Sequence, residues 1–363
     1  MGGRMPSLDG LRAISIALVL LGHLRGTRHF FTNLVPTGLA EFGVRVFFVI
    51  SGFLITSLLL GEWAATRSIS LRRFYLRRAF RIFPAFYVFL VTVLLLDALS
   101  VIVLQRFDGV AAATYTMNHH PQRSWWVGHL WSLSVEEQFY LLWPLIVALA
   151  GPSRAVWAAG AAVLAAPLVR LGIYLFLPAS RATIGEAFPT NCDALAVGCL
   201  LACLRGRLEQ DARYVWLLRS RVFLLLPPLA LAASLLTSKL VAVNYLFVQS
   251  FCNIVIALSL HRWVRYSEGR VGRFLNLRPV AFVGVMSYSL YLWPQLFLNR
   301  HSGALVHQFP LNVLLAVAAA LASYYLVERP FLRLRARRPV QPAATIEAAP
   351  MPGAVPITQG LNA

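Results

Sequence analysis

LDGLRAISIALVLLGHL, residues 8–24, is an apolar run that carries three ionisable side chains, Asp9, Arg12 and His23. A run of about this length is typical of a membrane-spanning helix, and lipid favours the helix because it offers the backbone no hydrogen-bond partners. The run does not fit a cleaved signal peptide, because it contains charges and no small-residue cleavage site follows it. We therefore expect a first transmembrane helix that stays in the mature protein.

Similar apolar runs recur along nearly the whole chain of 363 residues. The mean hydropathy is +0.67, and only 13% of the residues are charged, whereas soluble domains have about a quarter. We expect an all-α, polytopic integral membrane helical bundle with about ten transmembrane helices. The predicted spans are 8–24, 40–60, 82–104, 127–149, 155–177, 187–204, 219–237, 240–260, 279–299 and 305–327.

The domain organisation follows from the same pattern. We expect one transmembrane domain at residues 1–335. Residues 336–363 are rich in Pro and Ala without apolar periodicity, which predicts a disordered cytoplasmic tail.

The net charge of +19 raises the question of nucleic acid binding, and the placement of the basic residues answers it. Most of the 33 Lys and Arg residues fall in the loops 62–81, 205–221, 261–278 and 329–338, which alternating spans put on one side of the membrane. Loops rich in Lys and Arg face the cytoplasm. We therefore expect both termini in the cytoplasm and no nucleic acid partner.

Other classes of site find no support. The four cysteines lie in predicted spans without disulfide or metal-site spacing. No Walker sequence, dinucleotide fingerprint, zinc spacing or Ser nucleophile elbow is present. We expect no metal ion and no bound cofactor.

Ionisable side chains inside a span are costly, so each is a functional candidate. Arg12 and His23 are eleven residues apart, which is three helical turns plus about 20°, so they share one face about 16 Å apart. Arg12 would lie near the cytoplasmic end and His23 near the outer end. The alternative is that Arg12 snorkels towards the cytoplasm and His23 only caps the outer interface.

A basic helix start, LRRFYLRRAFRIFP (residues 71–84), places Arg77, Arg78 and Arg81 at the cytoplasmic mouth of a predicted span. Arg78 and Arg81 are three residues apart, close enough to hold one phosphate group together. Ordinary anchoring to lipid headgroups is the alternative.

The segment HLWSLSVEEQFYLLWP (residues 129–144) puts Glu136 and Glu137 inside a span. Consecutive helical residues diverge by about 100°, so at most one of the two can point at a given partner. An ion pair with Arg45 or Arg170 is the structural alternative for one of them. Two other predicted spans also contain polar side chains. Asp193 lies in one of them. The other contains a run of hydroxyls and rings at 287–293, a pattern that serves packing more often than chemistry.

Seven segments, taken in order, resemble the acyltransferase-3 family of bacterial membrane O-acyltransferases. The family's Arg followed by ten residues and His falls on Arg12 and His23, and its Arg-x-x-Arg falls on Arg78 and Arg81. Many relatives have a His after SYSLYLW, where this chain has Pro294-Gln295. The segments are LDGLRAISIALVLLGH (8–23), GVRVFFVISGFLIT (43–56), RRFYLRRAFRIFP (72–84), HLWSLSVEEQFYLLWP (129–144), CDALAVGCLLA (192–202), SYSLYLWP (287–294) and VERPF (327–331).

The resemblance implies an enzyme of the bacterial inner membrane that moves an acyl group, commonly acetyl, from cytoplasmic acyl-CoA to a hydroxyl of an extracytoplasmic glycan or glycolipid. Because acyl-CoA is a nucleotide polyanion with a long arm, we expect Arg12, Arg78 and Arg81 to hold its phosphates. Arg45 is a further candidate, which would steady the thioester oxygen as it gains negative charge.

The chemistry that we expect centres on His23. Its imidazole would take the proton from the attacking hydroxyl as a general base. Glu136 or Glu137 would orient the imidazole and stabilise its charged form. An acyl-histidine intermediate is the competing mechanism.

Two rival functions remain. A transporter or flippase for a lipid-linked saccharide would also need intramembrane charges, but the two halves of the chain show no convincing internal repeat. An unrelated class of membrane O-acyltransferase with a buried His would share the chemistry. The arginine pair joined to a histidine on the first helix argues against that class.

Overall fold

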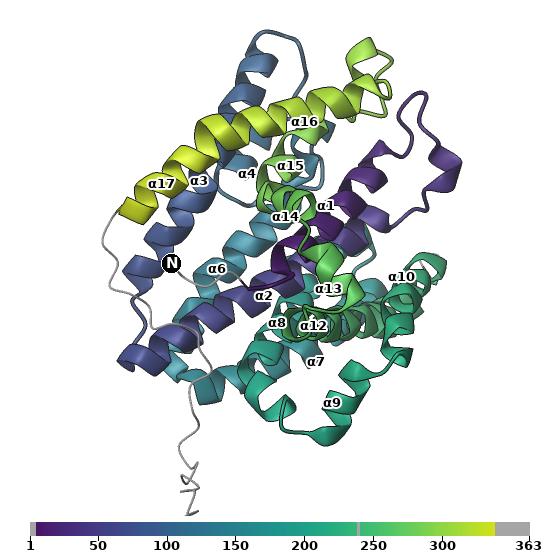
Figure 1. Cartoon of the computed structure of the whole chain (residues 1–363). Helices are drawn as coiled ribbons and strands as arrows, with labels where there is room; N and C mark the ends of the chain where they lie inside the picture. The colour runs from purple at the N-terminus through teal and green to yellow at the C-terminus, as the bar shows by residue number, and fades with distance from the viewer. Residues whose placement is uncertain (1–4, 238–239, 338–363) are drawn as a thin grey trace, which may run out of the picture.

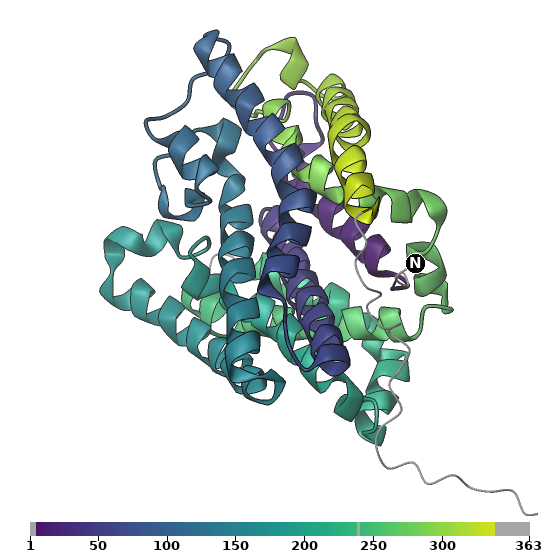
Figure 2. The same cartoon turned by 90° about the vertical axis from the view of Figure 1, so that its left-hand side faces the viewer.

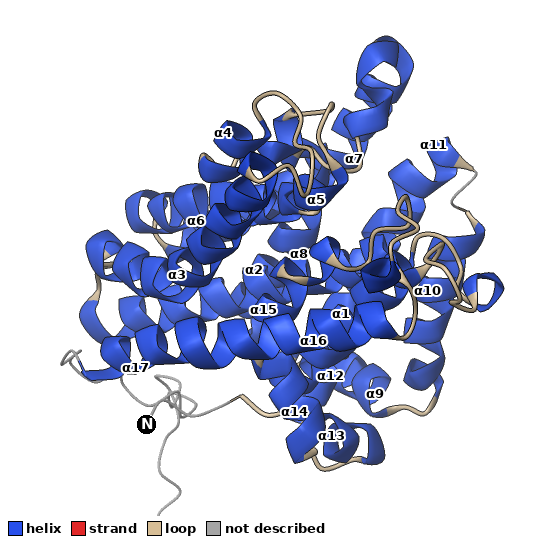
Figure 3. Cartoon of the chain, turned by 90° about the horizontal axis from the view of Figure 1, so that it is seen from above, coloured by secondary structure: helices blue, strands red, loops and turns tan. Residues whose placement is uncertain are grey.

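The computed structural model describes residues 5–237 and 240–337. Within these ranges the chain is helical throughout and contains no strand (Figure 3). The all-α class is thus confirmed. The division at residue 335 stays a prediction, since residues 338–363 of the expected tail lie outside the described residues.

Within residues 5–237 and 240–337, seven helical segments are long and apolar enough to cross a membrane. An eighth crossing is possible if the bent pair Ala212–Arg219 and Val222–Leu236, which meet at 63°, forms one span. The pair contains α9 (Ala212–Arg219) and α10 (Leu226–Leu236). The seven segments are α2 (Leu39–Thr66), α3 (Leu71–Ala98), α5 with α6 (Trp125–Ala150), α7 (Pro152–Phe176), α8 with the turn before it (Pro178–Leu208), α11 with α12 (Val241–Arg265), and α16 with α17 (Leu311–Leu334).

The expected number of about ten spans is not confirmed, because the predicted seventh span falls on this bent pair and the first and ninth are short or broken. Helix α1 (Leu8–Leu24) has 17 residues, which reach about 25 Å against a hydrocarbon thickness of about 30 Å. The ninth span divides into α14 (Arg278–Val285) and α15 (Ser287–Leu292). Pro294 follows α15 and starts a separate 3-10 turn, since proline lacks the backbone donor that would continue the helix.

Helix α1 lies in the middle of the bundle, between α2 and α14 (Figure 1). Both contacts are backbone to backbone. A Cβ on Gly43 would lie 2.7 Å from the carbonyl oxygen of Ser15, and one on Gly284 would lie 1.7 Å from that of Asp9. Ser15 Oγ also donates a hydrogen bond to the Gly43 carbonyl (2.5 Å). These contacts fix the rotation of α1 and hence the direction in which Arg12 points.

Two other helix contacts hold the bundle together. Helices α2 and α8 also meet through glycines: a Cβ on Gly52 would lie 1.9 Å from the Leu195 carbonyl oxygen, and one on Gly198 would lie 2.2 Å from that of Val49. Helix α3 runs beside α17 and the π-helical turn Tyr324–Glu328 that precedes it (Figure 2). Short helices α4 (Asp108–Ala113) and α13 (Arg270–Leu275) lie in the connections.

A buried ion pair joins α7 to α8. Arg170 Nη2 lies 2.9 Å from Asp193 Oδ2, and the two side chains are 1% and 0% exposed. The same guanidinium donates to the carbonyl oxygens of Thr190 (2.7 Å) and Tyr245 (2.8 Å). Arg170 and Asp193 are therefore fully engaged in holding helices together, and Arg170 pairs with neither Glu136 nor Glu137.

Candidate functional site

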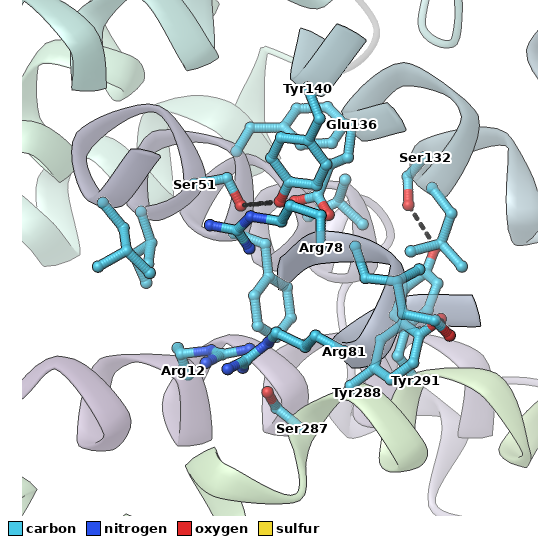
Figure 4. A pocket seen from close by; sticks show the side chains of 17 residues that line it. Arg12, Ser51, Arg78, Arg81, Ser132, Glu136, Tyr140, Ser287, Tyr288 and Tyr291 are labelled. Carbon is cyan, nitrogen blue, oxygen red and sulfur yellow. Dashed lines mark hydrogen bonds between the residues drawn. The ribbon is translucent and has the colours of Figure 1, made fainter. Parts of the chain in front are cut away.

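A pocket lies where α1, α2, α3, α6 and α15 meet (Figure 4). Helix α6 (Leu130–Ala150) follows the short α5 (Trp125–Gly128) in the third long segment. The walls combine apolar side chains from α2 with a polar set from all five helices. The polar residues are Arg12, Ser51, Arg78, Arg81, Ser132, Glu136, Tyr140, Ser287, Tyr288 and Tyr291.

Three guanidinium groups face this pocket, against one carboxylate, that of Glu136. Figure 4 shows Arg12, Arg78 and Arg81 together on one side of it. In the part of the chain that the structure describes, neither Arg12 nor Arg81 makes a hydrogen bond or ion pair, although the charges of Asp9, Glu136 and Glu328 act on them. Guanidinium groups held together away from water are costly unless an anion joins them. The pocket is therefore suited to an anionic ligand.

Glu136 is held by two neighbours in the pocket wall. Ser51 Oγ of α2 donates to Glu136 Oε1 (2.8 Å). The Tyr140 hydroxyl lies one turn further along α6 and approaches both Ser51 Oγ (3.2 Å) and Glu136 Oε2 (3.4 Å). The carboxylate thus keeps a fixed position beside the arginines, because charge-accepting hydrogen bonds restrict its rotamers.

Arg78 is fixed by aromatic rings. Its guanidinium carbon lies 4.8 Å from the centre of the Tyr140 ring and 5.8 Å from that of Phe74. Such stacking leaves the N–H groups at the edge of the guanidinium free for an oxyanion.

Hydroxyl groups lie at the opposite end of the pocket. The oxygens of Ser132 and Tyr291 lie 2.5 Å apart, and the Tyr291 hydroxyl donates to the carbonyl oxygen of His129 (2.6 Å). Figure 4 shows Ser132 and Tyr291 on the side away from the arginines.

His23 lies at the outer end of α1 and does not line the pocket. Its ring centre is 6.3 Å from that of Trp125, and the Arg300 guanidinium lies 4.9 Å from the Trp125 ring. Because α1 is one unbroken helix, Arg12 and His23 lie about 16 Å apart along it. No hydrogen bond joins His23 to Glu136 or Glu137 within the described ranges. The expected pairing of the imidazole with a glutamate is therefore not found, because Glu136 lies level with Arg12, three turns away.

Glu137 points into a different pocket, between α3 and α6. Its walls include Arg72, Phe83 and Tyr115, and only Arg78 and Tyr140 are shared with the first pocket. Burial, and then the charge of Glu137, raise the pKa of the Tyr115 hydroxyl. The 100° step between consecutive helical residues explains why Glu136, and not Glu137, lines the pocket with Arg12 and Arg81, while Glu137 lies beside Arg78 in the second pocket.

Arg45 is also outside the arginine pocket. It is 8% exposed, and its Nη1 donates to Asn253 Oδ1 at 3.4 Å. Its neighbours belong to the buried Arg170–Asp193 network rather than to the site of Arg12. The site residues predicted from the sequence therefore do not all come together. One pocket contains Arg12, Arg78, Arg81 and Glu136. The other three, His23, Glu137 and Arg45, lie outside that pocket or in a different one.

Several polar residues of the pocket could not be assigned to it from the sequence. Ser287, Tyr288 and Tyr291 were assigned to packing, yet all three line it. An intramembrane run of hydroxyls was the signal. Ser51 and Tyr140 gave no comparable signal, because a single hydroxyl in an apolar helix is common.

The chain matches the family model described as an acyltransferase domain over residues 5–329. The O-acetyltransferase OatA of Staphylococcus aureus is 27% identical over 383 aligned residues, which cover 90% of this chain and 57% of that protein. A second Staphylococcus aureus protein, provisionally named an O-acetyltransferase, is 30% identical over 364 residues, with the same coverage of 90% and 57%.

The chain thus spans little more than half the length of the curated relatives that it matches. No solved structure is significantly similar to it.

Proposed function

The chain belongs to the acyltransferase-3 family, and from that premise we propose that it is a membrane-bound O-acetyltransferase that uses cytoplasmic acyl-CoA. The acyl group, which we propose is acetyl, passes to a hydroxyl of a glycan or glycolipid outside the membrane. The observation that carries the proposal is the pocket in which Arg12, Arg78 and Arg81 face one another without enough carboxylates to balance them.

The donor half of the proposal rests on charge. Acyl-CoA carries several phosphate groups, and the paired N–H edges of arginine match phosphate oxygens. Arg78 already holds its planar group against Tyr140, so little side-chain entropy is lost when it binds. No hydrogen bond within the described ranges ties up Arg12 or Arg81, although the charges of Glu136 and Glu328 act on them.

The transfer half of the proposal rests on His23. Helix α1 carries Arg12 at one end and His23 near the other, so a donor bound by its phosphates can extend its arm along this helix. The hydroxyl oxygen attacks the thioester carbon, a C–O bond forms, and the C–S bond breaks. His23 takes the hydroxyl proton as general base, a role with gains of about 10²–10⁴ in rate.

Mass spectrometry of surface glycans tests this function. Cells that express the chain should show one added acyl mass, which disappears without the gene and with His23→Ala at equal protein abundance. His119→Ala changes an exposed histidine and should leave the acyl mass in place. Glycans that are identical with and without the gene would contradict the proposal.

A further inference from the structure

Arg300 stacks on an aromatic ring beside His23, in the connection between α15 and α16. Its guanidinium carbon lies 4.9 Å from the centre of the Trp125 ring, and the centre of the His23 ring lies 6.3 Å from that of the same residue. Arg300 is exposed and His23 is partly exposed. Because both groups contact one indole, a short saccharide with a hydroxyl at the imidazole can also reach the guanidinium.

Two sets of contacts restrict the direction of this guanidinium. Trp125 Nε1 donates to the carbonyl oxygen of Gln295 (3.0 Å), and Gln295 Nε2 donates to the carbonyl oxygen of Trp125 (2.9 Å). The stem of Arg300 packs against the turn after α1, where a Cβ on Gly26 would lie 3.5 Å from its Cβ and Cδ. The arginine is therefore oriented before a ligand binds, which lowers the entropy cost of binding.

The N–H groups of Arg300 are not used inside the protein. In the described part of the chain Arg300 makes no hydrogen bond or ion pair, although the charge of Glu41 acts on it. The arginine pocket has the same arrangement, since Arg78 stacks on Tyr140 at 4.8 Å. Stacking leaves the edge of a guanidinium open to a carboxylate or a phosphate, which it binds through paired N–H groups.

Positive charge gathers at this end of α1. Burial, and then the charge of Arg25, lower the pKa of the Arg300 guanidinium, whereas Glu41 raises it. Arg28 meets the same connection, since a Cβ on Gly303 would lie 3.4 Å from its Nη1. In the expected topology this end of the helix is outside, where loops contain few Lys or Arg. Three arginines gathered there indicate a ligand of opposite charge.

We propose that Arg300 binds an anionic group of the acceptor, so that the glycan or glycolipid carries a carboxylate or a phosphate close to the acylated hydroxyl. This inference rests on the proposed function and narrows its acceptor class. The indole of Trp125 orients the guanidinium, and the bound anion places the hydroxyl at His23. The anion is held equally before and during acyl transfer, so its loss raises KM and leaves kcat nearly unchanged.

Kinetics with the purified protein in lipid nanodiscs tests the anion. Acetyl-CoA is the donor, and surface glycans from cells that lack the gene are the acceptor. The glycans are used untreated, with their carboxyl groups reduced to alcohols, or dephosphorylated with hydrogen fluoride. We expect one of the two treatments to raise the wild-type KM for the glycan about 10-fold to 100-fold, from the loss of charge-assisted hydrogen bonds. The treatment that does so identifies the anion.

Arg300→Gln tests the residue. It should raise KM for the untreated glycan by the same factor, with kcat changed less than about twofold, and it should no longer distinguish treated from untreated glycan. Arg181→Gln is the matched control. Arg181 is also exposed and also stacks on a ring, 4.7 Å from the centre of Tyr174, but its Nε donates to the Tyr174 carbonyl oxygen (2.7 Å). Its KM should equal that of the wild type.

Two kinetic outcomes would overturn the inference. One is an Arg300→Gln variant with the wild-type KM for the untreated glycan. The other is a wild type with equal KM for all three glycans, which would show a neutral acceptor. Glycan binding without acetyl-CoA is a second measurement, and equal affinity of the wild type and Arg300→Gln would also overturn it. Weaker glycan binding by Arg300→Gln, together with no acetyl transfer by the wild type, would contradict the proposed function alone.

Discussion

The guanidinium group of Arg78 stacks on the ring of Tyr140 at 4.8 Å, and the Tyr140 hydroxyl lies 3.4 Å from Glu136 Oε2. One tyrosine therefore orients both a cation and an anion of the pocket. Because the ring holds Arg78 flat, the edge of the guanidinium is presented to a ligand in a fixed direction.

Arg78→Lys should weaken acetyl-CoA binding about tenfold, because an ammonium keeps the charge but loses both the stacking and the paired N–H edge. Arg67→Lys alters an exposed arginine and should change the affinity less than about twofold. Isothermal titration with the protein in lipid nanodiscs measures both. Equal affinity for Arg78→Lys and the wild type would remove Arg78 from the donor site.

Glu136→Gln should bind acetyl-CoA more tightly, by about threefold to tenfold, because it removes a negative charge next to the arginines that hold the phosphates. Gln can still accept the hydrogen bond from Ser51, so the fold should be kept. The same titration measures the change. Weaker binding in a protein of unchanged unfolding temperature would show that Glu136 holds the arginines in place instead of competing with the donor.

Gly52→Ala should destabilise the protein by about 1–3 kcal/mol or more, because its Cβ would lie 1.9 Å from the Leu195 carbonyl oxygen of α8. Gly61 is on the same helix, and a Cβ there meets nothing within 4 Å. Gly61→Ala is the matched control and should be neutral or slightly stabilising. Thermal unfolding in detergent compares the two. An unchanged unfolding temperature for Gly52→Ala would contradict the close contact of α2 and α8.

Asp193→Asn should cost about 3–5 kcal/mol, because it leaves the guanidinium of Arg170 buried without its counter-charge. The double change Arg170→Met with Asp193→Leu removes both charges and should restore part of that loss. Thermal unfolding of the single and double variants gives the comparison. A double variant less stable than the single one would show that packing, and not charge balance, dominates at this pair.

The positions of the helices could be predicted well where the apolar runs in the sequence are long. Helices α2, α3 and α7 contain the predicted spans 40–60, most of 82–104 and most of 155–177. The ninth span was predicted as one helix because composition does not show where backbone hydrogen bonds break. Pro294 was visible in the sequence, but its position inside an apolar run hid its effect.

The candidate site was predictable only in part. The spacing of Arg78 and Arg81 placed them on one helix face, and both line the pocket with Arg12. Which partner each charged group meets depends on the rotation of neighbouring helices, which close contacts such as that of Gly284 with Asp9 determine. The sequence therefore could not show that Glu136 meets Ser51 and not His23.

The central claim is that the arginine pocket binds the acyl donor. The most direct test compares acetyl-CoA binding to the purified wild type with binding to a double variant that carries both Arg12→Gln and Arg81→Gln. Neither arginine makes a hydrogen bond or ion pair in the described ranges, so we expect the double replacement to keep the fold. We expect the affinity to fall at least about 100-fold, from the loss of two charge-assisted phosphate contacts. Wild-type affinity in the double variant would contradict the assignment of this pocket to the donor.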